Sequence, residues 1–388
     1  MAAERDGDGR AHRAAFLFFG GPGEEVSAVE QAVTLKLKLH EPTKAKREMY
    51  QLMADRVTEF ANRYLSLPKK ERPRTSKEAA GISDSLPAAV LNQAIRDIRA
   101  KKKAKRFKRL WPTFNNQNFR VEREFSRDGR AVWKVSFPAL EKRVGVPVAV
   151  APYQERYLNL LLEGRARQGV ARLVRRGGDW YVHLSLAVAT GRRQGPEKVM
   201  GVDLGMVDLL VASVEGRTLF FSGGELAYVR RRYARLRRKL QKAGANRALK
   251  RLGDKEHRWV TDVNHKVSRR LVEFAVAHGV TKIRMEDLTG ARWVFPQGRE
   301  QRKDHGRSLQ YWPYYQLQKF IEYKAALVGI EVEYVRPDLT SLTCSRCGET
   351  VKSRPKGRWF RCPRCGREKH VDVNAADNIA QAVSGLAT

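Results

Sequence analysis

The four cysteines of this chain stand in two matched pairs near its C-terminus. Cys344, Cys347, Cys362 and Cys365 have the spacing C-x2-C-x14-C-x2-C, which is close to the pattern of a tetrathiolate zinc site. A dithiol redox pair is the alternative, but it does not explain two matched pairs. The segment between the pairs is too short to fold around an apolar core of its own. We therefore expect one structural zinc ion, because four protein ligands leave no position open for a substrate.

Charge is the second constraint on this chain. Its 388 residues include 76 Lys and Arg against 42 Asp and Glu, which gives a formal net charge of +34. Such a charge repels itself unless a polyanion is bound, so nucleic acid is the expected partner. No apolar run approaches the roughly 18 residues of a membrane-spanning helix, and AAFLFF at 14–19 lacks the cleavage site of a signal peptide. Paired cysteines without a secretory signal favour a reducing compartment, so we expect a cytoplasmic protein with no membrane partner.

The sequence pattern changes several times along the chain. Residues 1–30 carry no usable period and are expected to form a flexible arm. Residues 32–43 alternate as a strand does, and a helical block follows whose last helix ends in the basic run AKKKAKRFKRL. Residues 118–190 contain short alternating stretches typical of a β-barrel or sandwich. We expect the first strand to join that barrel, so that the helical block is an insert, and from residue 196 strands alternate with helices.

Three acids stand where a strand ends or a helix begins. Asp203 and Glu286 each end a predicted strand, in KVMGVD and VTKIRME, and Asp372 leads the helix VNAADNIAQAV. Mg²⁺ and Mn²⁺ prefer oxygen ligands, and two such ions about 4 Å apart stabilise both the attacking water and the leaving oxygen of phosphodiester hydrolysis. Each acid alone could be a turn residue, a helix cap or a solvated surface group. Their order and placement together favour a site for two Mg²⁺ or Mn²⁺ ions.

The strand pattern around these acids is that of the RNase H architecture, in which three antiparallel strands precede alternating helices and strands. Three further acids, Asp208, Asp287 and Asp377, are less well placed. We expect these three to be surface or capping groups.

Basic residues concentrate between the third and fourth strands of this part. Residues 225–253 hold eleven Lys or Arg and one acid, and such a run would fray unless phosphates neutralised it. A solvated helix face is the alternative to a nucleic-acid groove there. On the helix that starts after Pro87, two amide side chains could reach base edges, although a plain exposed face is the alternative. The expected nucleic-acid contacts are Arg230, Arg231, Arg232, Arg235, Arg237, Arg238, Lys239, Lys101, Lys102, Lys103, Asn92 and Gln93.

Together these motifs resemble the TnpB family of transposon-encoded RNA-guided nucleases and the related compact type V CRISPR effector nucleases. The matching segments are GVDLG at 201–205, MEDL at 285–288, TSLTCSRCG at 340–348, CPRCG at 362–366 and DVNAADNIA at 372–380. The chain departs from the family at Leu342, where a glutamine is usual, and in HVD at 370–372, where the family often has two acids around an arginine.

The resemblance implies a multidomain α+β and α/β fold. Its expected parts are a flexible arm at 1–30, a wedge β-barrel at 31–43 and 115–195, a helical recognition insert at 44–114, a RuvC-like (RNase H-like) nuclease domain at 196–338 and 371–388, and a zinc ribbon that binds target nucleic acid at 339–370.

The implied function is RNA-guided DNA cleavage in a prokaryotic cytoplasm, at the nucleoid when DNA is bound. The protein would bind a guide RNA, recognise a short flanking motif in double-stranded target DNA, and cut at one RuvC site with Asp203, Glu286 and Asp372 as catalytic triad. One alternative is a guide-dependent DNA-binding protein with little or no cleavage, which predicts a broken triad. The other is a guide-independent recombinase or resolvase, which needs no basic insert, barrel or RNA. Whether copies self-associate on the guide is left open.

Overall fold

The computed structural model describes residues 29–83, 86–126, 128–205, 207–288, 313–336, 339–352 and 357–382. Most of the expected arm at 1–30 therefore lies outside the described residues, and the first strand begins at Val29. The chain divides into two compact units, one of Val29–Ala189 and one that contains Thr190–Thr388. Among the helices in these ranges, none has the length and apolar character needed to cross a bilayer.

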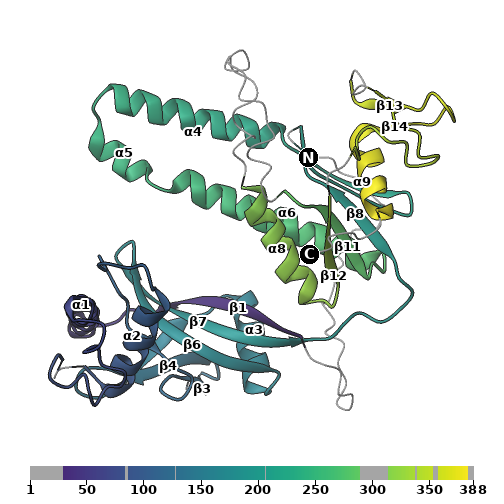
Figure 1. Cartoon of the computed structure of the whole chain (residues 1–388). Coiled ribbons are helices and arrows are strands. Elements are labelled where there is room, and N and C mark those ends of the chain that lie inside the picture. The colour runs from purple at the N-terminus through teal and green to yellow at the C-terminus, as the bar shows by residue number, and fades with distance from the viewer. Residues whose placement is uncertain are drawn as a thin grey trace. The chain divides into compact units, whose positions relative to one another are not determined.

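The first unit is built on a seven-stranded sheet (Figure 1). Its strands are β1 (Val29–Leu39), β2 (Thr113–Phe114), β3 (Arg120–Phe125), β4 (Ala131–Pro138), β5 (Arg143–Ala149), β6 (Ala166–Arg176) and β7 (Asp179–Thr190). The order β2-β6-β7-β1-β5-β4-β3 places β1 in one sheet with strands that follow it by more than 70 residues, as predicted. Within the described ranges the order is linear, so closure into a barrel stays a prediction.

Two helices, α1 (Lys44–Ser66) and α2 (Ala88–Ala100), lie between β1 and β2 in the sequence, as the expected helical insert does. The α1 helix contributes Tyr50 to a buried aromatic core, where its ring lies 5.4 Å from that of Trp180. The α2 helix ends at Ala100, so the prediction that it continues through the basic run is wrong. Successive like charges on one helix face destabilise that helix, and residues 101–104 form turns instead.

A third helix, α3 (Pro152–Leu162), was not predicted. Its start is fixed by the side chain of Gln154, which accepts a hydrogen bond from the Ala151 backbone N–H at 2.9 Å and donates one to the Lys36 carbonyl at 2.8 Å. Leu158 and Leu160 are buried. This docking is a tertiary contact, which the alternating stretches around the helix do not reveal.

The second unit contains a five-stranded sheet in the order β10-β9-β8-β11-β12. The strands are β8 (Val199–Asp203), β9 (Asp208–Val214), β10 (Arg217–Ser222), β11 (Lys282–Glu286) and β12 (Glu331–Val335). The first three are antiparallel neighbours, and β11 runs parallel to both β8 and β12. The predicted three antiparallel strands, followed by strands alternating with helices, are confirmed.

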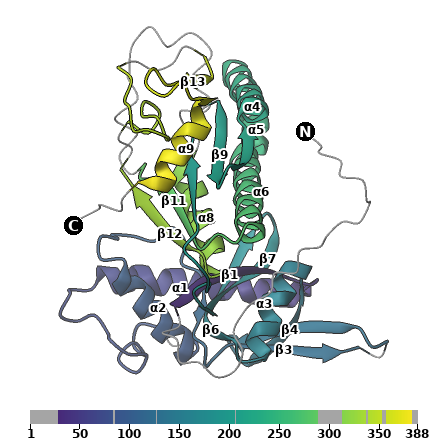
Figure 2. The same cartoon turned by 90° about the vertical axis from the view of Figure 1, so that its right-hand side faces the viewer.

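Helices cover both faces of this sheet (Figure 2). They are α4 (Gly224–Lys242), α5 (Asn246–Leu252), α6 (Lys255–Ala277), α8 (Tyr314–Ala326) and α9 (Val371–Gln381). On one face, Val202 and Met285 of the sheet share a core with Leu271 of α6 and Leu317 of α8. The basic segment at 225–253 forms the two helices α4 and α5, which are separated at Gly244, where a φ of +60° favours glycine. Figure 1 shows α4 and α6 as the two arms of a long hairpin.

The opposite face of the sheet holds α9, and Gly201 makes this packing possible. A Cβ atom at Gly201 would lie 1.8 Å from the Ala376 carbonyl oxygen and 2.7 Å from the Ala380 nitrogen. Both atoms belong to the backbone of α9, so neither can move away without displacing the helix. The glycine of the GVDLG motif is therefore needed for close helix–sheet contact.

We expect Gly201→Ala to lower the free energy of unfolding by about 3 kcal/mol, because an overpacked backbone contact cannot relax locally. The measurement is urea denaturation followed by circular dichroism. Gly224→Ala is the matched control, since a Cβ there would meet only the Ser222 hydroxyl at 3.5 Å. Equal denaturation midpoints for the two variants would contradict this reading of Gly201.

Candidate active site and cysteine centre

Asp203 and Glu286 end two neighbouring parallel strands. Val202 of β8 is paired with Met285 of β11, and the next residue on each strand is the acid. Parallel strands that end level bring their last side chains to the same edge of the sheet. The two predicted acids therefore stand side by side in the sheet.

Both acids also face α9. Side chains alternate along a strand, and Gly201, two residues before Asp203, lies against that helix. On β11, Arg284 stands two residues before Glu286, and its guanidinium donates a 2.7 Å hydrogen bond to the Ala380 carbonyl of α9. Asp203 and Glu286 therefore share the sheet face on which α9 and Asp372 lie.

Contacts from two segments fix the surroundings of these acids. Thr340 donates a hydrogen bond from its hydroxyl to Glu286 Oε1 at 2.6 Å, and Gln318 of α8 donates to the Glu286 carbonyl at 2.8 Å. Close to Asp203, the Tyr314 hydroxyl donates to the Gly205 carbonyl at 2.8 Å. Burial raises the pKa of Tyr314, and the Asp203 charge raises it further. Tyr314 is therefore a neutral hydrogen-bond donor that closes the turn after β8.

Asp372 lies in the first turn of α9 and is grouped with Asp208 and His370. The ligand atoms of these three residues all lie within 4.8 Å of one another. Asp203 and Glu286 are not members of this group, so the structure brings the predicted triad to one edge and one face without joining all three carboxylates in a single cluster. Asp208 begins β9 after the short turn that follows Asp203, which places the group at the same edge of the sheet.

A guanidinium group occupies the position of a cation in this cluster. Arg358 Nη2 contacts Asp208 and lies 3.7 Å from Asp372 Oδ2, and its Nε donates to His370 Nε2 at 3.0 Å. Burial lowers the pKa of His370, and its Nδ1 atom is buried without a hydrogen-bond partner within the described ranges. A cluster that attracts a guanidinium and has an orphaned ring nitrogen has the donor set of a cation site.

The expectation that Asp208 is a surface or capping group is wrong. Asp208 is 8% exposed and is held by Arg358, which lies 150 residues later in the sequence. Burial of a carboxylate requires such a partner. Sequence patterns do not reveal a pair at this separation.

The four cysteines converge on one point. Cys344 Sγ lies 3.7 Å from Cys365 Sγ, and Cys347 Sγ lies 3.5 Å from Cys362 Sγ. Four sulfurs bound about 2.3 Å from a tetrahedral zinc ion are about 3.8 Å apart, so these distances fit zinc. We call residues 339–352 and 357–370 the cysteine ribbon; it includes the strands β13 (Trp359–Arg361) and β14 (Glu368–His370).

Each cysteine pair lies in the same kind of turn. The Gly348 N–H donates to the Cys344 carbonyl at 2.9 Å, and the Gly366 N–H donates to the Cys362 carbonyl at 3.0 Å. Both glycines have a positive φ, +73° and +68°, which the C-x-x-C-G motif permits. Backbone N–H groups of Cys365, and then of Arg364, lower the pKa of Cys362 to about 7. At Cys362 the turn therefore favours the thiolate, which is the form that binds metal. At Cys347 the backbone N–H of Glu349 acts in the same direction, but desolvation and the neighbouring cysteines raise the pKa above its usual value.

Three polar residues of α9 attach the cysteine ribbon to the sheet. Asn374 Oδ1 accepts from the Ser345 N–H at 3.0 Å, and the Asn378 amide donates to the Thr340 carbonyl at 2.7 Å. Asp377 Oδ1 accepts from the hydroxyl of Ser213, on β9, at 2.6 Å. Its second oxygen contacts three side chains of the ribbon, those of Ser345, Arg367 and Lys369. Asp377 is thus a partly buried link between α9, the sheet and the ribbon, and its expected role as a surface or capping group is wrong.

We expect Asp377→Ala to lower the free energy of unfolding by about 2 kcal/mol. The change leaves two partly buried cations without their carboxylate, and it removes a link between α9, the sheet and the ribbon. Thermal unfolding and the metal content of the purified chain measure the effect. Asp262→Ala is the control, because Asp262 is exposed on α6 and pairs only with Lys266 among the ion pairs of the described chain. A melting temperature equal to that of the control would rule out the linking role.

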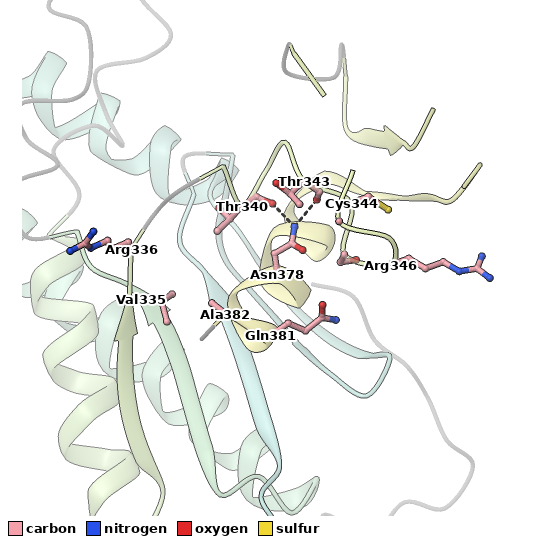
Figure 3. A pocket seen from close by; sticks show the side chains of 11 residues that line it. Val335, Arg336, Thr340, Thr343, Cys344, Arg346, Asn378, Gln381 and Ala382 are labelled. Carbon is pink, nitrogen blue, oxygen red and sulfur yellow. Dashed lines mark hydrogen bonds between the residues drawn. The ribbon is translucent and has the colours of Figure 1, made fainter. Parts of the chain in front are cut away.

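A pocket of about 480 Å³ lies between the end of β12, the first cysteine pair and the last turn of α9 (Figure 3). Its lining includes two arginines, but the side chains of Arg336 and Arg346 extend away from each other in Figure 3. The Asn378 amide is bound to the carbonyls of Thr340 and Thr343. The polar groups of the pocket thus serve the attachment of the ribbon, and the arginines do not converge on a common anion.

The residues expected to contact nucleic acid differ in their surroundings. Seven of these residues are basic side chains of α4, and five of the seven are exposed. The other two, Arg230 and Arg237, form ion pairs with Glu256 of α6 at 3.3 and 2.5 Å. These two therefore also hold the helical hairpin together. The exposed ones are Arg231, Arg232, Arg235, Arg238 and Lys239 on α4 and Lys101, Lys102 and Lys103 after α2.

The two amide residues of α2 have protein partners. Gln93 is 9% exposed and donates to Asp97 Oδ1 at 3.1 Å, so its side chain does not reach outward. The side-chain oxygen of Asn92, Oδ1, accepts from the Ser76 backbone N–H at 2.8 Å. Base contact by Gln93 does not agree with its burial, whereas contact by Asn92 stays a prediction.

Two stretches of the chain match known sequence families. Residues 183–292 match a family described as a probable transposase, and residues 314–379 match one described as Cas12f1-like, TNB domain. The first stretch contains Asp203 and Glu286, and the second contains Asp372 and all four cysteines.

Individual relatives extend these matches. The CRISPR-associated endodeoxyribonuclease Cas12f1 of Sulfoacidibacillus thermotolerans is 30% identical over 261 residues, which cover 62% of this chain and 60% of that protein. A TnpB-like protein of Methanocaldococcus jannaschii is 36% identical over 162 residues, which cover 40% of this chain and 56% of that protein. The chain thus matches less than two thirds of the length of either relative.

A solved structure shares the fold over most of the chain. The Cas12f1 protein of a Cas12f1–sgRNA–target DNA complex matches with a TM-score of 0.66 at 15% identity, over 90% of this chain and 99% of that one. At this identity the likeness shows a shared mixed α/β fold. The family matches, the relatives and the fold agree, and the chain is a relative of the TnpB-like proteins and of the compact Cas12f endodeoxyribonucleases, as its motifs predict.

Proposed function

We propose that the protein is an RNA-guided, Mg²⁺-dependent DNA endonuclease. Its second unit is assigned as a RuvC-like nuclease domain with an inserted zinc ribbon, and its first unit as a wedge domain with an inserted helical recognition part. The relatives support the nuclease, because Cas12f1 is named an endodeoxyribonuclease. The shared fold with a Cas12f1–sgRNA–target DNA complex supports guide RNA and target DNA as partners.

One observation carries the proposal for the catalytic site. Asp203 and Glu286 end adjacent parallel strands and face the helix that carries Asp372, all at one edge of the sheet. Acids on rigid strand ends suit metal-dependent phosphodiester hydrolysis, since carboxylate oxygens are the ligands that Mg²⁺ prefers. The Arg358 guanidinium beside Asp372 supports the same assignment, because it marks the position as one that attracts positive charge.

The chain's own residues have separate roles in the proposed reaction. Asp203, Glu286 and Asp372 hold the metal, and Thr340 orients the Glu286 carboxylate through its 2.6 Å hydrogen bond. Bound Mg²⁺ supplies activation of the attacking water and stabilisation of the leaving oxygen. For Asp372 to serve as a ligand, Arg358 gives up its contact with that carboxylate. Zinc in the cysteine ribbon takes no part in the chemistry; it fixes the ribbon to which α9 is attached.

Copurification tests the proposal. The protein is expressed with its native flanking DNA and purified, the bound RNA is sequenced, and plasmid cleavage is assayed with Mg²⁺ and with EDTA. We expect one discrete RNA species and cleavage that needs both that RNA and Mg²⁺. Absence of a discrete RNA, or cleavage that ignores added guide, would favour the guide-independent alternative. Guided binding without cleavage would favour the DNA-binding alternative.

A further inference from the structure

Two exposed aromatic residues lie beside the Asp208, His370 and Asp372 cluster. Trp359 of β13 is 65% exposed and Phe220 of β10 is 43% exposed. The His370 ring contacts both, with ring centroids 5.3 Å from Phe220 and 6.2 Å from Trp359. We call Phe220, Trp359 and His370 the aromatic platform. A tryptophan that leaves two thirds of its surface in water forgoes most of the favourable free energy that burial of the indole ring would give. We therefore expect a binding partner to cover Trp359.

Phe220 of the platform lies in the same row across the sheet as the proposed catalytic residue Asp203. Val211 of β9 is paired with Asp203 on one side and with Phe220 on the other. Directly paired residues point to the same face of a sheet, so Phe220 shares the face of Asp203. Neighbouring strands are about 4.8 Å apart, which places the two residues about 10 Å apart along the row. That separation is on the scale of the distance from one phosphate to a base of an adjoining nucleotide.

Charge around the platform indicates what covers it. Trp359 stands between Arg358 and Arg361 in the sequence RWFR. The Arg361 side chain pairs with the half-exposed Glu368 and is itself 77% exposed. An exposed indole between guanidinium groups combines base stacking with phosphate attraction, which is how proteins bind single strands of nucleic acid. A second copy of this chain, with its formal charge of +34, would bring like charge to the same face. Charge therefore favours nucleic acid over self-association.

We propose that the aromatic platform stacks on an unpaired base of the DNA strand being cut and thereby sets which phosphate reaches Asp203 and Glu286. This inference rests on the proposed nuclease function and adds residues that determine the position of the cut. Trp359 supplies the main stacking surface. Phe220 supports the other side of the His370 ring, and Arg361 contacts the backbone of the same strand.

Photo-crosslinking tests the platform without cleavage. The full chain with Asp203→Ala is mixed with an oligothymidylate of about 12 nucleotides that carries 5-iodouracil, irradiated, and mapped by mass spectrometry. We expect crosslinks at Trp359 or Phe220. Trp359→Ala should lower the yield at this site about tenfold, Trp359→Phe should largely keep it, and Leu339→Ala, at an exposed residue of the same ribbon, should not change it. Crosslinks confined to other sites, or a yield that Trp359→Ala does not change, would overturn the proposal.

Guided cleavage gives the second readout. Trp359→Ala should cut DNA about 5- to 160-fold more slowly, the effect of losing one base stack, and its cut positions should spread. Trp359→Phe should cut at the original positions. If the parent chain cuts and Trp359→Ala matches it in rate and position, the platform is wrong and the nuclease stands. If the parent chain never cuts, the nuclease is wrong and the crosslinks still decide the platform. Sedimentation of Trp359→Ala as a smaller species, with unchanged crosslinks, would assign the platform to self-association and contradict the proposal.

Discussion

Asp203→Asn is expected to lower the rate of guided DNA cleavage at least about a thousandfold while guided binding stays within about twofold. The amide has nearly the same shape as the carboxylate, so the end of β8 keeps its structure. It lacks the negative charge that holds a divalent cation, and contacts of the metal are strongest in the transition state. A thousandfold loss corresponds to about 4 kcal/mol of transition-state stabilisation. Single-turnover cleavage and filter binding with the same guide separate the two effects.

The control for this experiment is Asp262→Asn. Asp262 lies exposed on α6 and pairs with Lys266 at 2.7 Å. The substitution therefore makes the same change in net charge as Asp203→Asn, but away from the proposed site. We expect it to cut at the parental rate. Glu286→Gln and Asp372→Asn should behave like Asp203→Asn. Cleavage by Asp203→Asn within about tenfold of the parent would remove Asp203 from the proposed metal site.

Cys362→Ser should reduce the zinc content of the purified chain from one ion to nearly none and lower its melting temperature by about 10 °C or more. The four thiolates form one centre, and a hydroxyl is a poor replacement for a thiolate ligand of zinc. The cysteine ribbon has a small core, in which Phe360 is fully buried together with Cys344 and Cys362. Without the metal, that core does not suffice to hold the ribbon against α9.

The matched control is Glu349→Gln in the first cysteine turn. The Glu349 side chain is partly exposed, 3.8 Å from Arg364, and its backbone carbonyl, which accepts from the Cys344 N–H, is unchanged. We expect parental zinc content, measured by elemental analysis, and parental melting. Full folded yield of Cys362→Ser without zinc would show that the ribbon does not need a metal.

The parts of the fold that sequence predicts are those set by short-range pattern. The strand that ends at Asp203 is recognised by its apolar run and the glycine turn after it, and the cysteine turns by C-x-x-C-G. The place of Glu286 follows from strand periodicity in the same way. These signals lie within a few residues of one another, so no knowledge of the tertiary structure is needed to read them.

The features that sequence missed depend on partners distant in the chain. Asp208 is buried where Arg358 reaches it from the cysteine ribbon, and Asp377 is partly buried between Ser213 and the ribbon. Gln93 has the polarity of a surface residue and bonds to Asp97 one helical turn away, but it is buried because α2 packs on α1 and β2, which lie elsewhere in the chain. Local sequence pattern cannot assign such residues. Burial of a polar side chain stabilises or destabilises the fold according to whether its partner is present, and that partner is distant in the sequence.

Reprogramming of the guide tests whether the bound RNA directs DNA cleavage by this protein. Two guide RNAs that differ only in a segment of about 20 nucleotides are each assembled with the protein and given one plasmid that carries both matching targets. We predict that Mg²⁺-dependent cutting moves from one target to the other with the guide, and that Asp203→Asn abolishes both cuts. Cutting at the same position with either guide, or without any guide, would contradict RNA-guided cleavage.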